Sequence, residues 1–180
     1  AILGKSSMGK IPTDKIKILE PEQHLQLDDL DVNPFLVSHD AAEPQFYQFM
    51  ENDKKICLLT DTGYVSDRLK DEIKGADAYL LEFNHDLEML REGPYSWDLK
   101  QRILSDTGHL SNDSGGQTLV DIVDRHTKKV FLGHLSPENN TKAVAYEAAL
   151  ETCERAEPEV ASDFEILKTD PTTAQPLFTV

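Results

Sequence analysis

Short apolar runs separated by turn residues dominate the chain up to about residue 66. Runs rich in Val, Ile, Leu and Phe between Gly, Pro, Asn and Asp are typical of strands. They predict a strand over residues 15–21 and two short strands around an Asp-rich turn within residues 24–40. They also predict a hairpin over residues 44–61, turning at Glu51-Asn52-Asp53.

Beyond residue 66, helical spacing alternates with apolar runs. Residues 66–75 place Leu69 and Ile73 four positions apart, with Ser66 as an N-cap and Gly75 at the end, which predicts a helix. The same reasoning predicts further helices over residues 86–93, 97–106, 113–126 and 141–156, and strands over 76–84, 128–134, 163–169 and 176–180. Hairpins followed by alternating strands and helices indicate a layered α/β sandwich.

Composition limits the class of protein. The 180 residues fit one domain with a hydrophobic core. No segment approaches the ~20 apolar residues that a membrane span needs, so no membrane partner is expected. Cys57 and Cys153 are not part of a C-x-x-C pair, which favours reduced thiols and a cytoplasmic location. The net charge of −15 disfavours non-specific nucleic-acid binding, although bound metal cations can reverse the charge locally.

Polar side chains follow several of the predicted strands. His39 follows one strand, Asp61 the next, Glu82 and His85 stand at the end of a third, and His134 ends a fourth. If these strands are parallel, even in part, their carboxyl ends meet at one edge of the sheet. Imidazole and carboxylate together suit Zn²⁺, Mn²⁺ or Fe, so the pattern indicates a metal site.

The tetrapeptide Gly-His-Leu-Ser occurs twice, at residues 108–111 and 133–136, and each copy precedes a predicted helix. The glycine allows close backbone approach, and the serine can cap the helix. We therefore expect His109 and His134 each to lie at a helix N-terminus. That position disfavours imidazolium and suits a neutral metal ligand.

Each of these residues also has an ordinary structural interpretation. A single histidine at a strand end is more often a satisfied polar residue than a ligand, and Asp61 before Thr62-Gly63 is typical of a turn or cap. His24, in a polar stretch, and His126, at a helix end, are assigned no functional role. From the residues alone, a metal site and a set of caps both remain open.

Four longer stretches resemble a known family. VSHDAAEPQFYQF, LTDTGYVSD, LEFNHDLEMLREGPYSWDLKQRILSDTGHLSN and LGHLSPENNT are similar to the YycJ/WalJ/VicX group of the metallo-β-lactamase superfamily, relatives of the tRNA-processing nuclease tRNase Z. The resemblance implies an αββα sandwich with a dinuclear metal site, containing Zn or Mn, at one edge. Residues 1–180 would be the C-terminal part of that single domain.

The resemblance also implies roles for individual residues. His39 resembles a ligand of one metal, Asp61 the carboxylate that bridges both, and His134 a ligand of the other. His109 resembles a histidine that lies over the scissile phosphate and protonates the leaving oxygen. Glu82 and His85 lie near the position of another family motif.

One family feature is absent from the chain. The motif His-x-His-x-Asp-His, which supplies four ligand positions, does not occur, and the sequence begins AILGKSSMGK, without an initiator methionine. We expect these residues to be the C-terminal two-thirds of a protein of roughly 270 residues. Alone, they should be inactive, with partial or no metal occupancy. An exposed apolar face should favour a homodimer or association with the missing N-terminal segment.

The function implied by the resemblance is a metal-dependent phosphodiesterase, a DNA nuclease of the 5′–3′ exonuclease type. Basic residues such as Lys128 and Lys129 are expected to assist binding of the DNA. Two alternatives from other classes remain: hydrolysis of a small ester, lactam or thioester, because the fold supports many hydrolases, and a non-catalytic regulatory module without metal.

Overall fold

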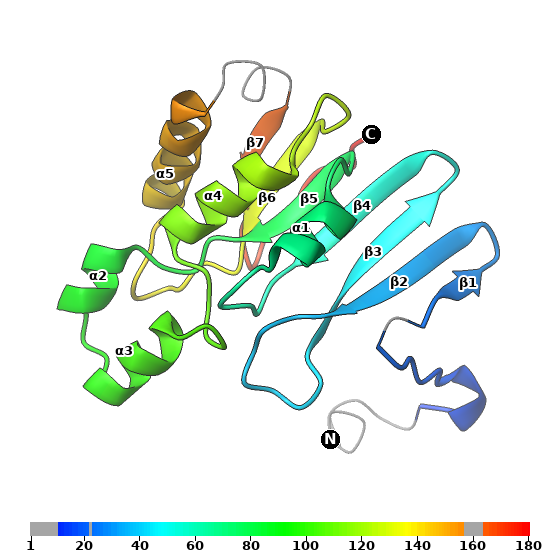
Figure 1. Ribbon diagram of the computed structural model, residues 1–180, viewed down its shortest axis with the longest axis horizontal. Coiled ribbons are helices and arrows are strands. Elements are labelled where there is room, and N and C mark those ends of the chain that lie inside the picture. Colours follow the sequence, from blue (N-terminus) through cyan, green and yellow to red (C-terminus); the bar gives the residue numbers. More distant parts are fainter. Residues whose placement is uncertain (1–10, 22, 157–163) are drawn as a thin grey trace.

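The structure, a computed structural model, describes residues 11–21, 23–156 and 164–180 (Figure 1). Its centre is one seven-stranded sheet in which the strands follow the order of the sequence. The strands are β1 (Leu25–Leu27), β2 (Leu30–Leu36), β3 (Gln45–Glu51), β4 (Lys54–Leu59), β5 (Ala78–Glu82), β6 (Lys129–Gly133) and β7 (Glu165–Lys168). The predicted α/β class is confirmed.

The first half of the sheet is antiparallel. β1 to β4 pair as successive hairpins, with Leu27 opposite Leu30 and Glu51 opposite Lys54 at the two tight turns. Asp28 and Asn52 adopt φ values of 53° and 51° in these turns, a region that Asp and Asn enter more easily than most residues. Both predicted hairpins are therefore confirmed.

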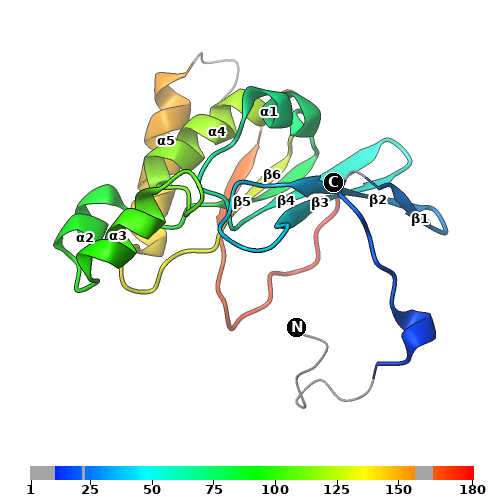
Figure 2. The ribbon, with the colours of Figure 1, turned by 60° about the horizontal axis from the view of Figure 1, so that its bottom comes forward.

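The second half of the sheet is parallel. β4 to β7 run side by side in the same direction, and helices make the connections between them. These helices are α1 (Asp67–Ile73), α2 (Leu87–Glu92), α3 (Trp97–Leu104), α4 (Asn112–Ile122) and α5 (Lys142–Arg155). In Figure 2, α2 and α3 lie beyond the ends of β5 and β6, whereas α1, α4 and α5 cover the sheet.

The helices begin where capping residues stand in the sequence. At each start a side-chain oxygen accepts a hydrogen bond from a backbone N–H in the first turn, and the caps are Ser66, Asp86, Ser96, Ser111 and Thr141. Helix α4 ends earlier than predicted, at Ile122, because Val123 is extended and Asp124 to Thr127 form a hydrogen-bonded turn.

Two predicted strands are wrong. Residues 16–20 contain no strand and follow a 3₁₀ turn at Thr13–Lys15; Ile18 is 80% exposed, and no strand of the described residues pairs with this segment. Residues 176–180 also form no strand. Phe178 instead packs its ring on Phe131 of β6, with the centroids 4.9 Å apart. The apolar start of the chain lies outside the described residues.

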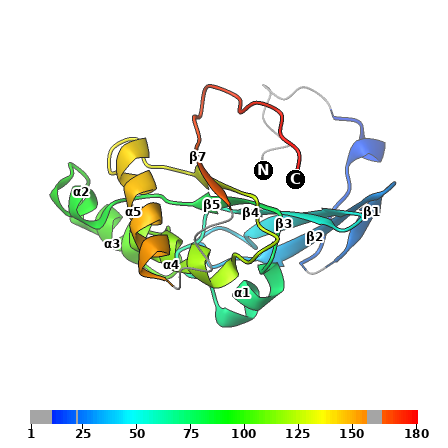
Figure 3. The same ribbon diagram turned by 90° about the horizontal axis from the view of Figure 1, so that it is seen from above.

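The two faces of the sheet differ. On the helical face, Cys57, Leu59, Leu81, Val130 and Leu132 are buried in the main core beneath α1, α4 and α5. On the other face, Figure 3 shows no helix of the parallel half; the C-terminal segment runs over it. An apolar hollow of about 240 Å³ lies there, lined by residues that include Ile56, Leu58, Leu80, Phe131 and Phe178. The described residues thus form one α layer and one β layer, in agreement with the predicted αββα class.

Candidate metal centre

The carboxyl ends of four strands, and the loops that follow them, lie at one edge of the sheet. β4, β5 and β6 are parallel, and β2 runs in their direction because both β2 and β4 are antiparallel to β3. His39 follows β2, Asp61 follows β4, Glu82 ends β5 and His134 follows β6. The predicted convergence of these strand ends is confirmed, and His109 joins them from the loop before α4.

Asp61 is surrounded by three imidazole rings. Its Oδ1 lies 3.5 Å from Nε2 of His134, 3.8 Å from Nε2 of His39 and 4.0 Å from Nδ1 of His109. A tetrahedral Zn²⁺ with ligand bonds near 2.0–2.1 Å places neighbouring ligand atoms ~3.4 Å apart. The separations of Asp61 from His39 and from His134 are therefore close to those between ligands of a divalent metal. Two groups of side chains lie close enough together to hold one ion: His39 with Asp61 and His109, and Glu82 with His109 and His134.

The imidazoles of His39 and His134 are oriented by their second nitrogens. Nδ1 of His39 lies 3.1 Å from the carbonyl oxygen of Gly108, which only accepts, so Nδ1 carries the proton. Nδ1 of His134 donates in the same way to Oε1 of Glu82 at 2.7 Å. Each ring then turns Nε2, with its lone pair, toward Asp61. This is the arrangement that metal-binding histidines adopt.

Glu82 is a buried carboxylate shared by two histidines. Its side chain is 0% exposed, and Oε1 accepts from Nδ1 of both His109 and His134 at 2.7 Å. Oε2 accepts from the backbone N–H of Thr62 at 2.9 Å. Burial raises the pKa of Glu82, but these three hydrogen bonds outweigh it and leave the pKa below its usual value. The resemblance placed Glu82 only near a family motif. An acidic residue ending an apolar strand was the sequence signal for this role.

The backbone is strained at two of the candidate ligands. Asp61 and His134 both have φ of 56°, in the left-handed region that residues other than glycine rarely adopt. The side chain of Asn84 donates to the carbonyl oxygen of His134 at 2.9 Å and helps to hold it there. Aspartate and histidine enter this region more easily than most residues, and at both positions the side chain belongs to the cluster.

Close backbone packing at Gly63 fixes the loop that carries His109. A Cβ at Gly63 would lie 2.3 Å from the carbonyl oxygen of Ser105 and 2.6 Å from the nitrogen of Gly108. Gly63 also donates its N–H to the carbonyl oxygen of Ser38 at 2.9 Å. The loops after β2 and β4 and the loop before α4 therefore form one packed unit, which explains the glycine after Asp61-Thr62.

The two Gly-His-Leu-Ser copies differ in structure. Ser111 caps α4, as predicted, and His109 stands two residues before it. The second prediction is wrong: α5 is capped by Thr141, and Ser136 instead accepts from the backbone N–H of Asn139. His134 therefore does not lie at a helix N-terminus. Its hydrogen bond to Glu82 raises its pKa, against the predicted direction.

The other histidines lie outside the cluster. His85 is 1% exposed, forms an isolated β-bridge with Ser111 and has no hydrogen-bond partner at Nε2 within the described structure. Burial lowers its pKa to about 4. His24 and His126 are exposed, and neither belongs to the groups of possible metal ligands, consistent with their structural interpretation.

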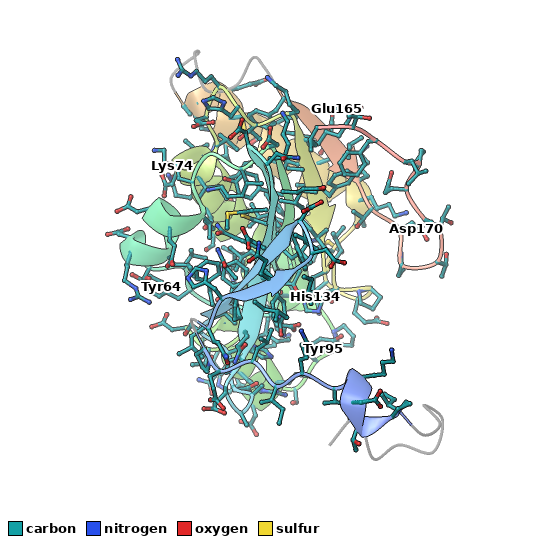
Figure 4. All side chains as sticks on the ribbon, turned by 90° about the vertical axis from the view of Figure 1, so that its right-hand side faces the viewer. Tyr64, Lys74, Tyr95, His134, Glu165 and Asp170 are labelled. Carbon is teal, nitrogen blue, oxygen red and sulfur yellow. The ribbon has the colours of Figure 1, made fainter. Side chains whose placement is uncertain are left out.

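A cleft of about 370 Å³ opens over the cluster. His39, Asp61, His109 and His134 line it together with Tyr95 and Arg102; Figure 4 shows Tyr95 and His134 along this side of the molecule. Lys128 and Lys129, which we expected to assist substrate binding, are not at the cleft. They lie at the amino end of β6, a strand five residues long, whereas His134 follows its carboxyl end. That separation is about 16 Å.

Comparison with protein families identifies the relatives of this chain. Residues 4–161 match the family model described as a β-lactamase superfamily domain. The chain is 48% identical over 170 residues to the "Exodeoxyribonuclease WalJ" of Streptococcus pneumoniae, covering 94% of this chain and 63% of that protein. It is 47% identical over 164 residues to the "Exodeoxyribonuclease YycJ" of Bacillus anthracis, covering 91% of this chain and 62% of that protein. The chain thus spans less than two thirds of the length of these relatives.

Solved structures agree on the fold. The metallo-β-lactamase fold protein YhfI from Bacillus subtilis matches with a TM-score of 0.60 at 14% identity, over 84% of this chain and 51% of that one. Zn²⁺-bound PqqB from Methylobacterium extorquens matches with a TM-score of 0.54 at 16% identity, over 83% of this chain and 49% of that one. The predicted resemblance is confirmed: the chain belongs to the β-lactamase superfamily and has its metallo-β-lactamase fold.

Proposed function

We propose that this chain carries part of the active site of a metal-dependent phosphodiesterase, a DNA nuclease of the 5′–3′ exonuclease type in the complete protein. The observation that carries the proposal is the cluster of His39, Asp61 and His134, with Nε2 of both histidines facing Oδ1 of Asp61. Relatives at 47–48% identity are named exodeoxyribonucleases, which supports a nucleic-acid substrate.

The donor set supports Zn²⁺ or Mn²⁺ as the metal. His39 would hold one ion and His134 a second, and Oδ1 of Asp61 lies near both rings. Imidazole and carboxylate ligands suit both metals. When bound, such ions supply Lewis-acid polarisation of a phosphodiester and lower the pKa of water.

His109 is proposed as the proton donor to the leaving oxygen. Glu82 accepts from Nδ1 of His109 at 2.7 Å, which fixes the ring, and Nε2 is then the nitrogen that would donate a proton to the leaving oxygen. The ring of His109 lies 5.1 Å, centroid to centroid, from the rings of both His39 and His134, in the middle of the site. A proton donor in this position would act on the same phosphate that the metal ligands surround.

Two partner assignments accompany this function. The apolar face of the sheet that carries no helix is proposed to pack against the remainder of the complete protein or a second copy of the chain. Along the described residues, no helix is both long and apolar enough to cross a membrane. Cys57 and Cys153 are both free and buried, which supports a reducing, cytoplasmic location.

The test is hydrolysis by the complete protein with and without added Mn²⁺ or Zn²⁺. We expect 5′-end-labelled linear DNA to release mononucleotides from its 5′ end, while covalently closed circular DNA stays intact. Small esters, thioesters and a β-lactam serve as alternative substrates. Faster turnover of one of these than of DNA would favour the small-molecule hydrolase, and absence of both bound metal and hydrolysis would favour the regulatory module.

A further inference from the structure

The cleft over the metal centre continues past His134. A second hollow, of about 390 Å³, shares His134, Leu135, Ser136 and Pro137 with the first. Its far side is formed by the start of α5 and by the loop after β7, including Lys142 and Asp170. In Figure 4, Tyr95 of the first hollow and Asp170 of the second lie on different sides of His134. The candidate metal centre therefore stands inside a longer groove.

Each arm of this groove carries a cation paired with an acid. In the first arm the guanidinium of Arg102 binds Asp40 through two hydrogen bonds, one of them 2.9 Å from Nη2 to Oδ1. In the second arm, Nζ of Lys142 binds Oδ2 of Asp170. The side chains of Arg102 and Lys142 are 61% and 46% exposed, so both cations are open to solvent and ligand.

Neither pair is needed to hold its loop. Asp40 is tied by its backbone N–H to the carbonyl oxygen of Thr107 at 3.0 Å. Oδ1 of Asp170 already accepts from the backbone N–H groups of Thr172 and Thr173. The Lys142–Asp170 pair is a single exposed contact, of the kind that contributes only about 0–1 kcal/mol to stability. Arg102 binds Asp40 through two hydrogen bonds, but its side chain is 61% exposed, so solvent and salt screen that pair as well. The cations can therefore exchange a carboxylate for another anion at little cost to the fold.

We propose that one DNA strand lies along this groove, with Arg102 and Lys142 binding phosphates on opposite sides of the scissile bond. The inference rests on the proposed function and adds the path of the substrate. The guanidinium of Arg102 has the fork geometry that binds two phosphate oxygens, and the ammonium of Lys142 is a point charge suited to a backbone phosphate. In a chain with a net charge of −15, Asp40 and Asp170 hold these two cations in place until phosphate replaces them.

The experiment measures kcat/KM of the complete, metal-loaded protein on a single-stranded oligodeoxynucleotide at several salt concentrations. Bis(p-nitrophenyl) phosphate, a phosphodiester too short to reach both cations, is measured in parallel. The test variants are Arg102→Gln and Lys142→Gln. Arg155→Gln and Lys129→Gln are matched controls, because both cations also pair with an acid, Glu151 and Glu165 respectively, but neither lines the groove.

Each test variant should lower kcat/KM on the oligonucleotide about tenfold, as expected for loss of one charged hydrogen bond. Each should also reduce the slope of log kcat/KM against log salt by ~0.7, the value for one phosphate contact on a single strand. The loss on bis(p-nitrophenyl) phosphate should be smaller, and the controls should match the unmodified protein. The midpoint of thermal unfolding checks that all variants are folded.

Two outcomes separate this inference from the function on which it rests. Unchanged salt slopes in both test variants, or equal losses on the two substrates, would overturn the substrate path while leaving a working phosphodiesterase. An unmodified protein that hydrolyses neither substrate would overturn the proposed function, and the path with it.

Discussion

β5 has a buried carboxylate at each end, and the two serve different purposes. Asp77, just before the strand, accepts a hydrogen bond from Nζ of Lys54 at 3.0 Å and from the backbone N–H of Lys55 at 2.9 Å. Glu82, the last residue of the strand, accepts from the imidazoles of His109 and His134. In both cases hydrogen bonds to the charged form bring the pKa of the carboxyl below its usual value, against the effect of burial.

The partners of the two carboxylates explain the difference. The ammonium of Lys54 and the backbone N–H of Lys55 hold the side chain of Asp77 against β4, and its backbone carbonyl oxygen also accepts from the N–H groups of Lys128 and Lys129. An imidazole bound through Nδ1 still has Nε2, so the histidines on Glu82 can bind a metal or move a proton. Of the two carboxylates of β5, the one beside the candidate metal centre is the one whose partners keep a second functional atom.

The largest effect is expected at Asp61, at the centre of the candidate metal centre. In the complete protein, Asp61→Ala should abolish nuclease activity and lower bound metal, because it removes the oxygen that faces both His39 and His134. Metal analysis and the DNA assay measure the two effects. Asp67→Ala, at an aspartate 95% exposed in the first turn of α1, is the control. Normal metal content and activity in Asp61→Ala would remove Asp61 from the site.

Replacing each of the two carboxylates by the corresponding amide tests the comparison directly. Glu82→Gln should lower the rate by about 10²–10⁴-fold, because one amide cannot accept from two imidazoles and also from the N–H of Thr62. Asp77→Asn should leave the rate intact and lower the free energy of unfolding by about 1–3 kcal/mol. DNA hydrolysis and urea denaturation measure the two quantities. A large rate loss in Asp77→Asn would show that the amino end of β5 also belongs to the site.

The two histidines on Glu82 should differ from each other. His134→Ala should lower metal occupancy, because its Nε2 lies 3.5 Å from Oδ1 of Asp61. His109→Ala should keep the metal and lose about 10²–10⁴-fold in rate, as expected for loss of a proton donor. Metal stoichiometry and kcat are measured on both variants. Equal metal loss in the two would mean that these roles are wrongly assigned.

A smaller effect is expected for metal binding by the 180-residue chain alone. Their candidate ligands His39, Asp61 and His134 lack the four positions of the His-x-His-x-Asp-His motif, so titration with Zn²⁺ or Mn²⁺ should show at most one weak site. Isothermal titration calorimetry gives the number of sites and the affinity. Two tight sites per chain would show that the absent motif is dispensable.

The smallest effect is expected at two buried thiols, Cys57 in β4 and Cys153 in α5. Burial raises the pKa of the Cys57 thiol to about 12 and that of Cys153 to about 11. Both thiols should stay protonated at pH 8 and react with a thiol reagent only as fast as the protein unfolds. The reaction is followed in native buffer and in urea. Fast labelling in native buffer would contradict the buried positions.

The sequence alone determined most of the secondary structure. The hairpins between β1 and β4 and the caps of α1 and α4 depend on interactions within a few residues, which local patterns record. The strand predicted over residues 15–21 was wrong, because an apolar run becomes a strand only when a neighbouring strand can pair with it. The strand-end positions of His39, Asp61 and His134 were likewise visible in the sequence.

The contacts among the strand-end residues depend on the tertiary structure. The hydrogen bonds of Glu82 to His109 and His134 and the pairing of Arg102 with Asp40 each join segments that are distant in sequence. So does the raised pKa of His134, which follows from Glu82, 52 residues away, and not from the nearby helix. Local patterns fix which residues reach the edge of the sheet. Strand order and direction decide which of them meet, and a hydrogen bond or a metal site exists only between atoms that meet.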